Sequence, residues 1–362
     1  MFKSVLTILI AACQFFGADV SQDPASLTAP EVCSWPDNRK AAVSITIDDG
    51  DYGSALTFNE LFKKYDVHAT EFLIPAAFEE KDEAIKGWAD LFAEGYIDIG
   101  NHSYDHTLRY NEYDTYTDEQ LDYDVNASYD ILKKSFPDAD ILSYATPWGQ
   151  TNDKVTKVIE QNHYAIRGVG GDIVESKKWM NLFSLPSYVV VFGTTAEELN
   201  SITDEAISGG DWFIQLHHAV GGEDSPADAL STNPKELEAH LEYLNARSQE
   251  NDVWAGSFND VVKYISERTK AKTTVLWTRK SSIGLSLTDS MEDNELFDYP
   301  LTLKVYLPES WTGRVRVSQG SMHETCTIEE ENGQKFVYIH AVPDGGNITV
   351  RKPILDSLFK IF

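Results

Sequence analysis

Positive charge is scarce in this sequence of 362 residues. It contains 30 lysines and arginines against 58 aspartates and glutamates, which gives a formal net charge of -28 and a pI of about 4.6. Nucleic acids and anionic membrane surfaces are bound through basic patches. The charge balance therefore argues against both as partners, and it suits a protein that acts on a neutral or cationic substrate.

Long apolar segments are also lacking beyond the amino terminus, so we predict no transmembrane segment. At the amino terminus, the basic start MFK precedes the apolar stretch SVLTILIAACQFF, which is too short to cross a bilayer. Residues 1–18 are therefore predicted to be an export signal. Gly17 and Ala18 offer small residues for cleavage, whereas IAAC, ending at Cys13, resembles a bacterial lipobox whose cysteine would carry a lipid anchor. Either way we expect an exported protein, which is secreted, periplasmic or attached to the cell envelope.

Cysteine is rare, and removal of the export signal would leave only Cys33 and Cys326. In an exported protein such a pair forms a disulfide or remains as two buried thiols. The sequence favours neither alternative.

The sequence has no internal repeat and no low-complexity segment. Residues 19–37 are polar and contain proline, which indicates a leader loop. From residue 38 to residue 270, short apolar runs alternate with amphipathic segments, beginning with VSITI and SALTFNELFKKY and ending with FNDVVKYISERT. Alternation sustained over this length predicts βα units around a mostly parallel sheet. About seven units would close into a distorted (β/α) barrel.

The pattern changes over residues 271–352. Short alternating runs such as LTLKVYLP and KFVYIHAV are separated by turn residues, which predicts a small antiparallel β-sandwich. Trp277 and Trp311 offer stacking surfaces for sugars or serve as core residues, and the structural role is favoured. Residues 353–362 form an apolar tail, which we expect to pack back on the protein.

Two adjacent carboxylates, Asp48 and Asp49, directly follow the buried run VSITI. Like charges at the end of a buried strand repel each other, and desolvation adds to the cost. The chain has only nine histidines, and four of them follow two other predicted strands: His102 and His106 in NHSYDH, and His217 and His218 in LHH. Barrel enzymes carry their chemistry at such strand ends.

A divalent ion would remove the repulsion between the two aspartates. If the segment from His102 to His106 enters a helix, both imidazoles lie on one face and can share an ion. Asp49 would complete a set of two histidines and one aspartate, which leaves coordination positions open, as catalytic metal sites do. Asp48 then stays free to accept a proton from water activated by the ion.

Four motifs together resemble a known family. TIDDG (46–50), HSYDH (102–106), PWG (147–149) and LHH (216–218) occur in the order and rough spacing of the polysaccharide deacetylases, the NodB-type carbohydrate esterases of family four. The resemblance covers about residues 38–270 and does not extend to the β-sandwich.

The resemblance implies a role for each matching residue. Asp48 matches the catalytic base, and the backbone N–H of Trp148 matches a donor to the oxyanion. The general acid matches His218, with His217 as the alternative. The divalent metal, usually Zn²⁺, would be held by Asp49, His102 and His106.

The chain departs from the family at the third motif, where Ala145 occupies the position of an arginine that usually holds the catalytic base. The segment AIRGVGGD supplies two substitutes from the next strand end. Arg167 would replace the missing arginine, and Asp172 would orient the acid histidine. Alternatively, Arg167 is an ordinary ion-pair residue.

We therefore predict a metal-dependent hydrolase that removes acetyl groups from a polysaccharide, with N-acetyl groups of a GlcNAc-containing glycan as the favoured substrate. Its reaction would be hydrolysis of a non-peptide carbon–nitrogen bond. An O-acetyl esterase acting on xylan or another glycan shares the same chemistry. A non-heme iron oxygenase shares the ligand set, but the α/β pattern argues against it. A glycan-binding protein with a weak catalytic domain is supported only by the missing arginine.

Overall fold

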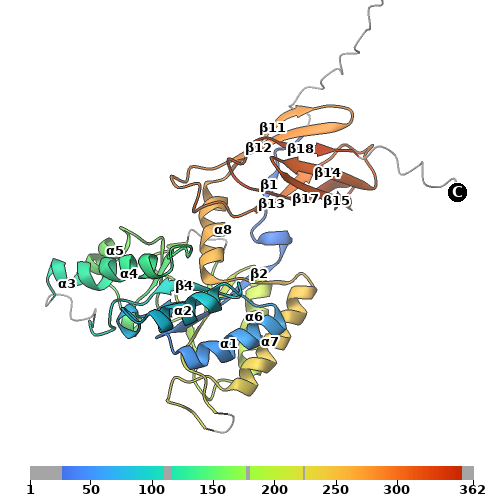
Figure 1. The fold of residues 1–362 in the computed structure, drawn as a ribbon. Helices are drawn as coiled ribbons and strands as arrows, with labels where there is room; N and C mark the ends of the chain where they lie inside the picture. The colour runs from blue at the N-terminus through green and yellow to red at the C-terminus, as the bar shows by residue number, and fades with distance from the viewer. Residues whose placement is uncertain (1–26, 110–115, 177–179, 223–224, 353–362) are drawn as a thin grey trace, which may run out of the picture.

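The computed structural model describes residues 27–109, 116–176, 180–222 and 225–352. The predicted export signal with Cys13 and the apolar tail at 353–362 lie outside the described residues. The chain forms an α/β body, with two antiparallel sheets standing at one side of it (Figure 1). Within the described ranges, no helix combines the length and the apolar character that crossing a membrane requires.

The α/β body is built on a curled, mostly parallel sheet. Its strand order is β6-β5-β4-β3-β2-β9-β7, with β10 also paired to β2 and β8 to β9. Only β7 runs antiparallel to its neighbour. The predicted fold class, a distorted βα barrel followed by an all-β region, is confirmed. The strands are β2 (Ala41–Asp48), β3 (Ala69–Leu73), β4 (Ile97–Asn101), β5 (Ser143–Ala145), β6 (Ala165–Arg167), β7 (Ile173–Val174), β8 (Tyr188–Val189), β9 (Trp212–His217) and β10 (Val253–Ala255).

Helices connect the strands, and polar side chains cap several of them. Asp51 accepts hydrogen bonds from the first turn of α1, and Ser257 does the same for α8. The segment 117–136 contains a π-helical turn at Tyr123–Ala127 between two α-helices. The helices are α1 (Tyr52–Tyr65), α2 (Asp82–Phe92), α3 (Asp118–Asp122), α4 (Ser128–Ser135), α5 (Asp153–Ile159), α6 (Ala196–Gly209), α7 (Pro234–Gln249) and α8 (Phe258–Lys270).

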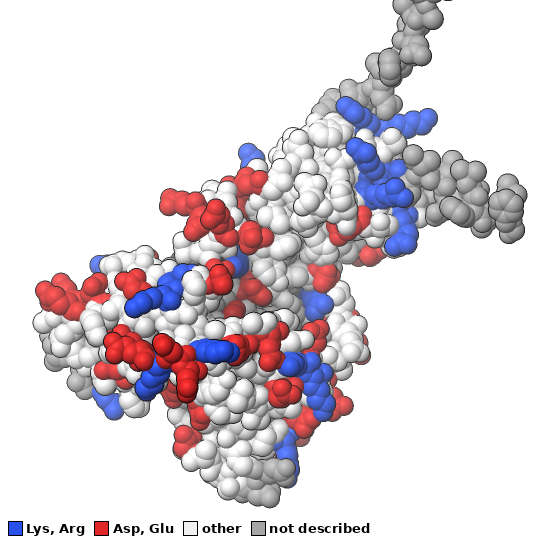
Figure 2. All heavy atoms as spheres, in the orientation of Figure 1, with Lys and Arg blue, Asp and Glu red and all other residues white. Residues whose placement is uncertain are grey.

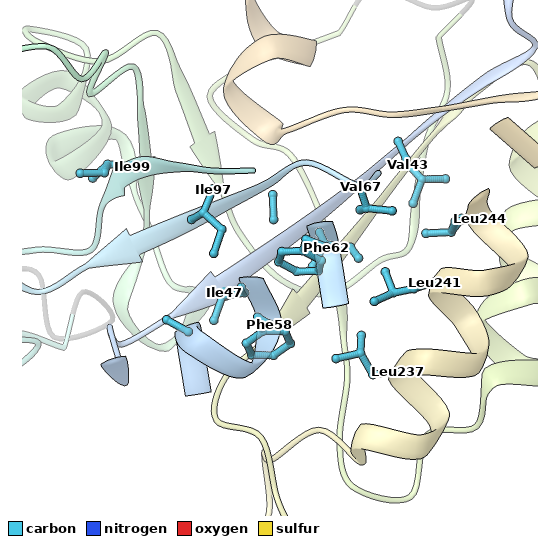
Figure 3. Close-up of a cluster of buried hydrophobic side chains, with 14 of the residues drawn as sticks. Val43, Ile47, Phe58, Phe62, Val67, Ile97, Ile99, Leu237, Leu241 and Leu244 are labelled. Atoms are coloured by element: carbon cyan, nitrogen blue, oxygen red, sulfur yellow. The ribbon is translucent and has the colours of Figure 1, made fainter. Parts of the chain in front are cut away.

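The main core lies between the sheet and its outer helices. Alternate residues of β2, including Val43 and Ile47, meet Phe58 of α1 and Leu237 and Leu241 of α7 (Figure 3). Each such side chain contributes about 1.5–3 kcal/mol when it is fully buried. This packing fixes β2 in the middle of the body, so its last residues are held rigidly.

The C-terminal region consists of two antiparallel sheets packed face to face. One has the order β1-β13-β17-β16 and the other β11-β12-β18-β14-β15. Trp311 is 1% exposed and belongs to the core between them. It therefore has the structural role that the sequence favoured. The strands are β11 (Lys272–Thr278), β12 (Ser282–Thr288), β13 (Leu301–Tyr306), β14 (Arg314–Gln319), β15 (Met322–Thr327), β16 (Glu329–Glu331), β17 (Gln334–Ala341) and β18 (Ile348–Arg351).

The expected leader loop contains structure of its own. Its strand β1 (Glu31–Val32) pairs antiparallel with β13, and a short 3-10 helix, η2 (Pro36–Asn38), follows. Cys33 and Cys326 are both free thiols, so no disulfide links the leader to the C-terminal sheets. The connection between the two regions is instead made by backbone pairing.

Candidate active site

The candidate site begins where β2 ends. All eight residues of β2 are buried, and the last of them, Asp48, is 4% exposed. The chain then turns through Asp49 and Gly50, which both have left-handed φ angles, of 77° and 70°. This turn directs the carboxylate of Asp49 to the surface, where its side chain is half exposed. Two adjacent carboxylates thereby acquire different surroundings.

Arg167 offsets the buried charge of Asp48. Its Nη2 donates hydrogen bonds to both carboxylate oxygens, and the guanidinium is fully buried. Arg167 stands directly opposite Ala145 in the parallel pairing of β5 and β6. The strand next to Ala145 thus places an arginine against Asp48 at the same level of the sheet. Its guanidinium also lies 5.4 Å from the ring centroid of Phe72.

The two histidines of the second motif come together without a helix. Residues 102–108 form an irregular loop, so the helical arrangement considered from the sequence is wrong. Ser103 and His106 have φ angles of 66° and 58°, which a right-handed helix excludes. The amide of His106 donates to Ser103 Oγ at 3.0 Å, and this turn brings the His102 and His106 ring centroids to 4.9 Å.

Asp49, His102 and His106 form a cluster whose ligand atoms lie within 4.8 Å of one another. His102 Nδ1 is 2.9 Å from the carbonyl oxygen of Ala145, so this nitrogen carries the proton and donates it. His102 Nε2 is left with its electron pair, 3.6 Å from Asp49 Oδ1. Burial alone would raise the pKa of Asp49, but the hydrogen bond and charge of His102 in its protonated form, together with the charges of His218 and His106, lower it to about 2.

Trp148 lies at the edge of this cluster, in the 3-10 turn η6 (Pro147–Gly149). Its φ angle of 59° is left-handed, which is strained for a bulky residue. The side chain is 50% exposed, its ring centroid is 5.0 Å from that of His106, and the Arg109 guanidinium lies 4.2 Å above it. The turn therefore presents an aromatic surface beside His106.

His217 is part of a buried hydrogen-bonded chain. Gln215 Oε1 can only accept, so His217 Nε2 donates to it (3.1 Å) and His217 Nδ1 accepts from Thr232 Oγ1 (2.9 Å). Gln215 Nε2 donates to His240 (2.8 Å), which donates to Asn200 (2.7 Å). Burial, with the charge of His240 as a smaller cause, lowers the pKa of His217 to about 3. A histidine held neutral in this way has a structural role.

His218 faces the cluster of Asp49, His102 and His106 instead. It is partly exposed, and its charge is one of those that lower the pKa of Asp49. Its Nδ1 is shielded from solvent and has no hydrogen-bond partner among the residues described. Asp172, predicted to orient it, is exposed and accepts from the amide of Ile173 at 2.9 Å. No hydrogen bond between Asp172 and His218 occurs in the described part of the chain, so that role remains a prediction without structural support.

Sequence reasoning overlooked Glu71 on β3. It is fully buried behind the turn at Asp49, and neither carboxylate oxygen has a hydrogen-bond partner in the described residues. Burial, and then the charges of Asp48 and Asp49, raise the pKa of Glu71 well above its usual range. Burial therefore favours the protonated, neutral form of this side chain. An acidic residue inside the apolar strand ATEFL was the available signal.

Comparison with known proteins places these residues in a family context. Residues 36–166 match the family model described as polysaccharide deacetylase. A gellan lyase from a Bacillus species is 24% identical over 351 residues, which are 92% of this chain but only 14% of that protein.

Two solved structures resemble the chain in part. One is a family 4 carbohydrate esterase pseudoenzyme from Bacillus anthracis, with 18% identity and a TM-score of 0.41 over 62% of this chain and 66% of that one. The other is a putative polysaccharide deacetylase from Mycobacterium smegmatis, with 14% identity and a TM-score of 0.44 over 67% and 96%.

Proposed function

We propose that this chain, whose residues 36–166 match the polysaccharide deacetylase family model, is a metal-dependent hydrolase that removes acetyl groups from a polysaccharide. The observation that carries the proposal is the Asp48–Arg167 pair beside the cluster of Asp49, His102 and His106. A paired, buried carboxylate next to three metal-ligating side chains is the arrangement that metal-assisted hydrolysis requires. N-acetyl groups of a GlcNAc-containing glycan are the favoured substrate.

The donor set fits a divalent cation. Two imidazoles and one carboxylate suit Zn²⁺, the favoured ion. His102 has the correct tautomer for a ligand, because the carbonyl of Ala145 fixes its proton on Nδ1. Asp49 is ionised over the whole physiological range, since its pKa is about 2. A cation held there would supply Lewis acidity and make a nearby water more acidic.

The remaining residues have distinct roles in acetyl removal. Asp48 accepts the proton of the attacking water, and the hydrogen bonds from Arg167 hold that carboxylate in place. The backbone N–H of Trp148 donates to the oxygen on which negative charge develops. His218, on the partly exposed side of the cluster, donates a proton to the departing nitrogen or oxygen.

An O-acetyl esterase acting on xylan or another glycan remains the alternative, because the same groups would perform both reactions. A glycan-binding protein with a weak catalytic domain is less well supported, since Arg167 occupies the place of the missing arginine. The amino-terminal sequence MFKSVLTILIAAC supports export, either as a secreted protein or attached to the cell envelope.

Acetate release from a glycan panel tests the proposal. We expect the purified full chain, supplied with Zn²⁺, to release acetate from chitin oligosaccharides or from acetylated xylan oligosaccharides. The ratio of the two rates identifies the N- or O-acetyl preference. Asp48→Asn should abolish release while the protein retains its metal. Absence of acetate from every glycan tested would overturn the proposal.

A further inference from the structure

One exposed face of the C-terminal sheets carries a group of arginines. Arg314 and Arg316 of β14 and Arg351 of β18 are exposed, whereas the residues between and beside them point into the core. Adjacent strands lie about 4.8 Å apart, and alternate residues along one strand about 6.7 Å apart. The three guanidinium groups therefore share a small area, which we call the basic sheet face.

The basic sheet face is electrostatically costly in isolation. Arg316 and Arg351 stand directly opposite each other in the antiparallel pairing of β14 and β18. Like charges at such positions destabilise a sheet. Nevertheless, none of the three arginines forms an ion pair within the described ranges, although the chain has 28 more acidic than basic residues. On the side drawn in Figure 2, Lys and Arg gather at the outer end of the C-terminal sheets, whereas the α/β body carries many Asp and Glu with Lys and Arg among them.

An aromatic ring lies on the same side of the sheet. Trp277 of β11 is opposite Gly284 of β12, and a Cβ atom at Gly284 would lie 2.2 Å from the indole ring. The ring therefore covers Gly284, and the register continues from Gly284 to Thr349 of β18, two residues from Arg351. The indole Nε1 has no hydrogen-bond partner in the described residues.

Hydroxyl side chains complete the rows around the arginines. Ser282 is opposite Arg351, Thr325 is opposite Arg316, and Thr327 is opposite Arg314. The face thus combines planar cations, a partly exposed indole and hydroxyl groups on an extended surface. Hydroxyls donate to and accept from sugar hydroxyls, and guanidinium groups bind carboxylates through two parallel hydrogen bonds.

We propose that the basic sheet face binds an anionic polysaccharide, with Arg316 and Arg351 on uronate carboxylates and Trp277 against a sugar ring. This binding activity lies beyond the proposed hydrolysis and does not depend on it. A nucleic acid is the less suitable polyanion, because duplex DNA carries one charge per about 1.7 Å and the α/β body would repel it. A polyuronate carries at most one carboxylate per sugar and meets less repulsion.

Calorimetric titration of the full chain with oligogalacturonate tests the proposal without any turnover. We expect the parent to bind at low salt and to bind more weakly as salt is raised. The double variant Arg316→Ala/Arg351→Ala should weaken binding by roughly 10- to 100-fold, since two charge-assisted contacts are lost. Trp277→Ala should weaken it by about 3- to 10-fold.

The control variant Lys134→Ala/Lys157→Ala removes two exposed positive charges from α4 and α5 of the α/β body. It should bind like the parent. Arg316→Gln/Arg351→Gln keeps polar side chains at both positions and relieves the repulsion, so its melting temperature should equal or exceed that of the parent. It therefore reports on binding even if the alanine variant is destabilised.

Several outcomes would overturn the proposal. These are no binding of oligogalacturonate at low salt, equal binding by the arginine variants and the parent, and equal binding of carboxyl-reduced oligosaccharides. Tighter binding of duplex DNA or of vesicles containing anionic lipid would assign the face to a different partner. Loss of binding in the lysine control would show that net charge, and not this face, is responsible.

Discussion

Arg167 donates hydrogen bonds to both carboxylate oxygens of Asp48, a residue 119 positions earlier in the chain. Both side chains are almost completely buried. The pair depends on the parallel register that places Arg167 level with Ala145. A buried charge that loses its partner is strongly destabilising, so each residue of the pair requires the other.

Replacing Arg167 should therefore alter the pH dependence of the reaction. In Arg167→Gln, the carboxylate of Asp48 loses the cation that favours its ionised form, so the acid limb of the pH–rate profile should move to higher pH. Arg167→Lys should restore part of the parent profile because it keeps the charge without the two-pronged geometry. Rates measured between pH 4 and 9 check this, with melting curves to confirm folding. A parent-like profile in Arg167→Gln would show that Asp48 works without this partner.

Each member of the metal-ligand cluster should be required for metal binding. Asp49→Ala, His102→Ala and His106→Ala should each lose bound metal and acetate release together, because three ligands leave little redundancy. Elemental analysis after dialysis measures the metal content. His323→Ala, which removes an exposed histidine from β15, is the matched control and should keep both. Full metal content in His102→Ala would show that the site is wrongly assigned.

The adjacent histidines His217 and His218 should respond differently to substitution. His218→Ala should keep its metal and its melting temperature but lose a factor on the order of 10² to 10⁴ in turnover. His217→Ala should instead lower the free energy of unfolding by about 2–4 kcal/mol, since it opens a cavity and leaves Gln215 and Thr232 unpaired. Denaturant titration and initial rates on both variants separate the effects. The opposite ranking would assign the general acid to His217.

His340 should make stability depend on alkaline pH. Its ring is 2.9 Å from Asp37 and 3.0 Å from Glu324, and these partners raise the pKa of His340 to about 10. A raised pKa contributes stability that is complete below the unfolded value, near 6.5, and is lost as the pH rises through 10. Because the groups are partly exposed, the contribution is less than about 1 kcal/mol.

Denaturant titrations at pH 7 and pH 10 measure this effect. The parent should lose more stability over that interval than His340→Gln, in which the titrating group is absent. Equal losses in the two proteins would mean that the ion pairs of His340 do not contribute.

Local sequence patterns were sufficient to predict the architecture. The hydrophobic periodicity within each segment distinguishes apolar strands from amphipathic helices. The parallel sheet and its central strand β2 were therefore predictable. The places of Asp48, Asp49 and His218 in the site could then be predicted as well, because catalytic residues in such folds lie at the carboxyl ends of strands. The shape of the loop from His102 to His106 did not follow. Its left-handed residues are not glycines, and nothing local marks them.

Features that depend on register between distant segments could not be settled from the sequence. The sequence offered Arg167 either as a replacement for the missing arginine or as an ordinary ion-pair residue, and the alignment of β5 with β6 and the contact with Asp48 favour the first. The structural role of His217 depends on hydrogen bonds that join it to Thr232 and, through Gln215 and His240, to Asn200. Thr232 and Asn200 lie in different segments between the strands. Such contacts are fixed by packing of the whole body rather than by local propensity.

The pairing of β1 with β13 gives the chain an unusual order of assembly. Strand β1 belongs to the C-terminal sheets but precedes the whole α/β body in the sequence. Its partner residues in β13, Leu303 and Lys304, follow the α/β body. The β-sandwich, whose other strands follow the α/β body, thus takes one short edge strand from the segment that precedes that body. During synthesis, β1 cannot pair until about 270 further residues have been made. The two paired strands are therefore separated by a long stretch of sequence. Cutting the chain near residue 271 would therefore not yield two intact pieces, because the sandwich would lose an edge strand that only the amino-terminal fragment carries.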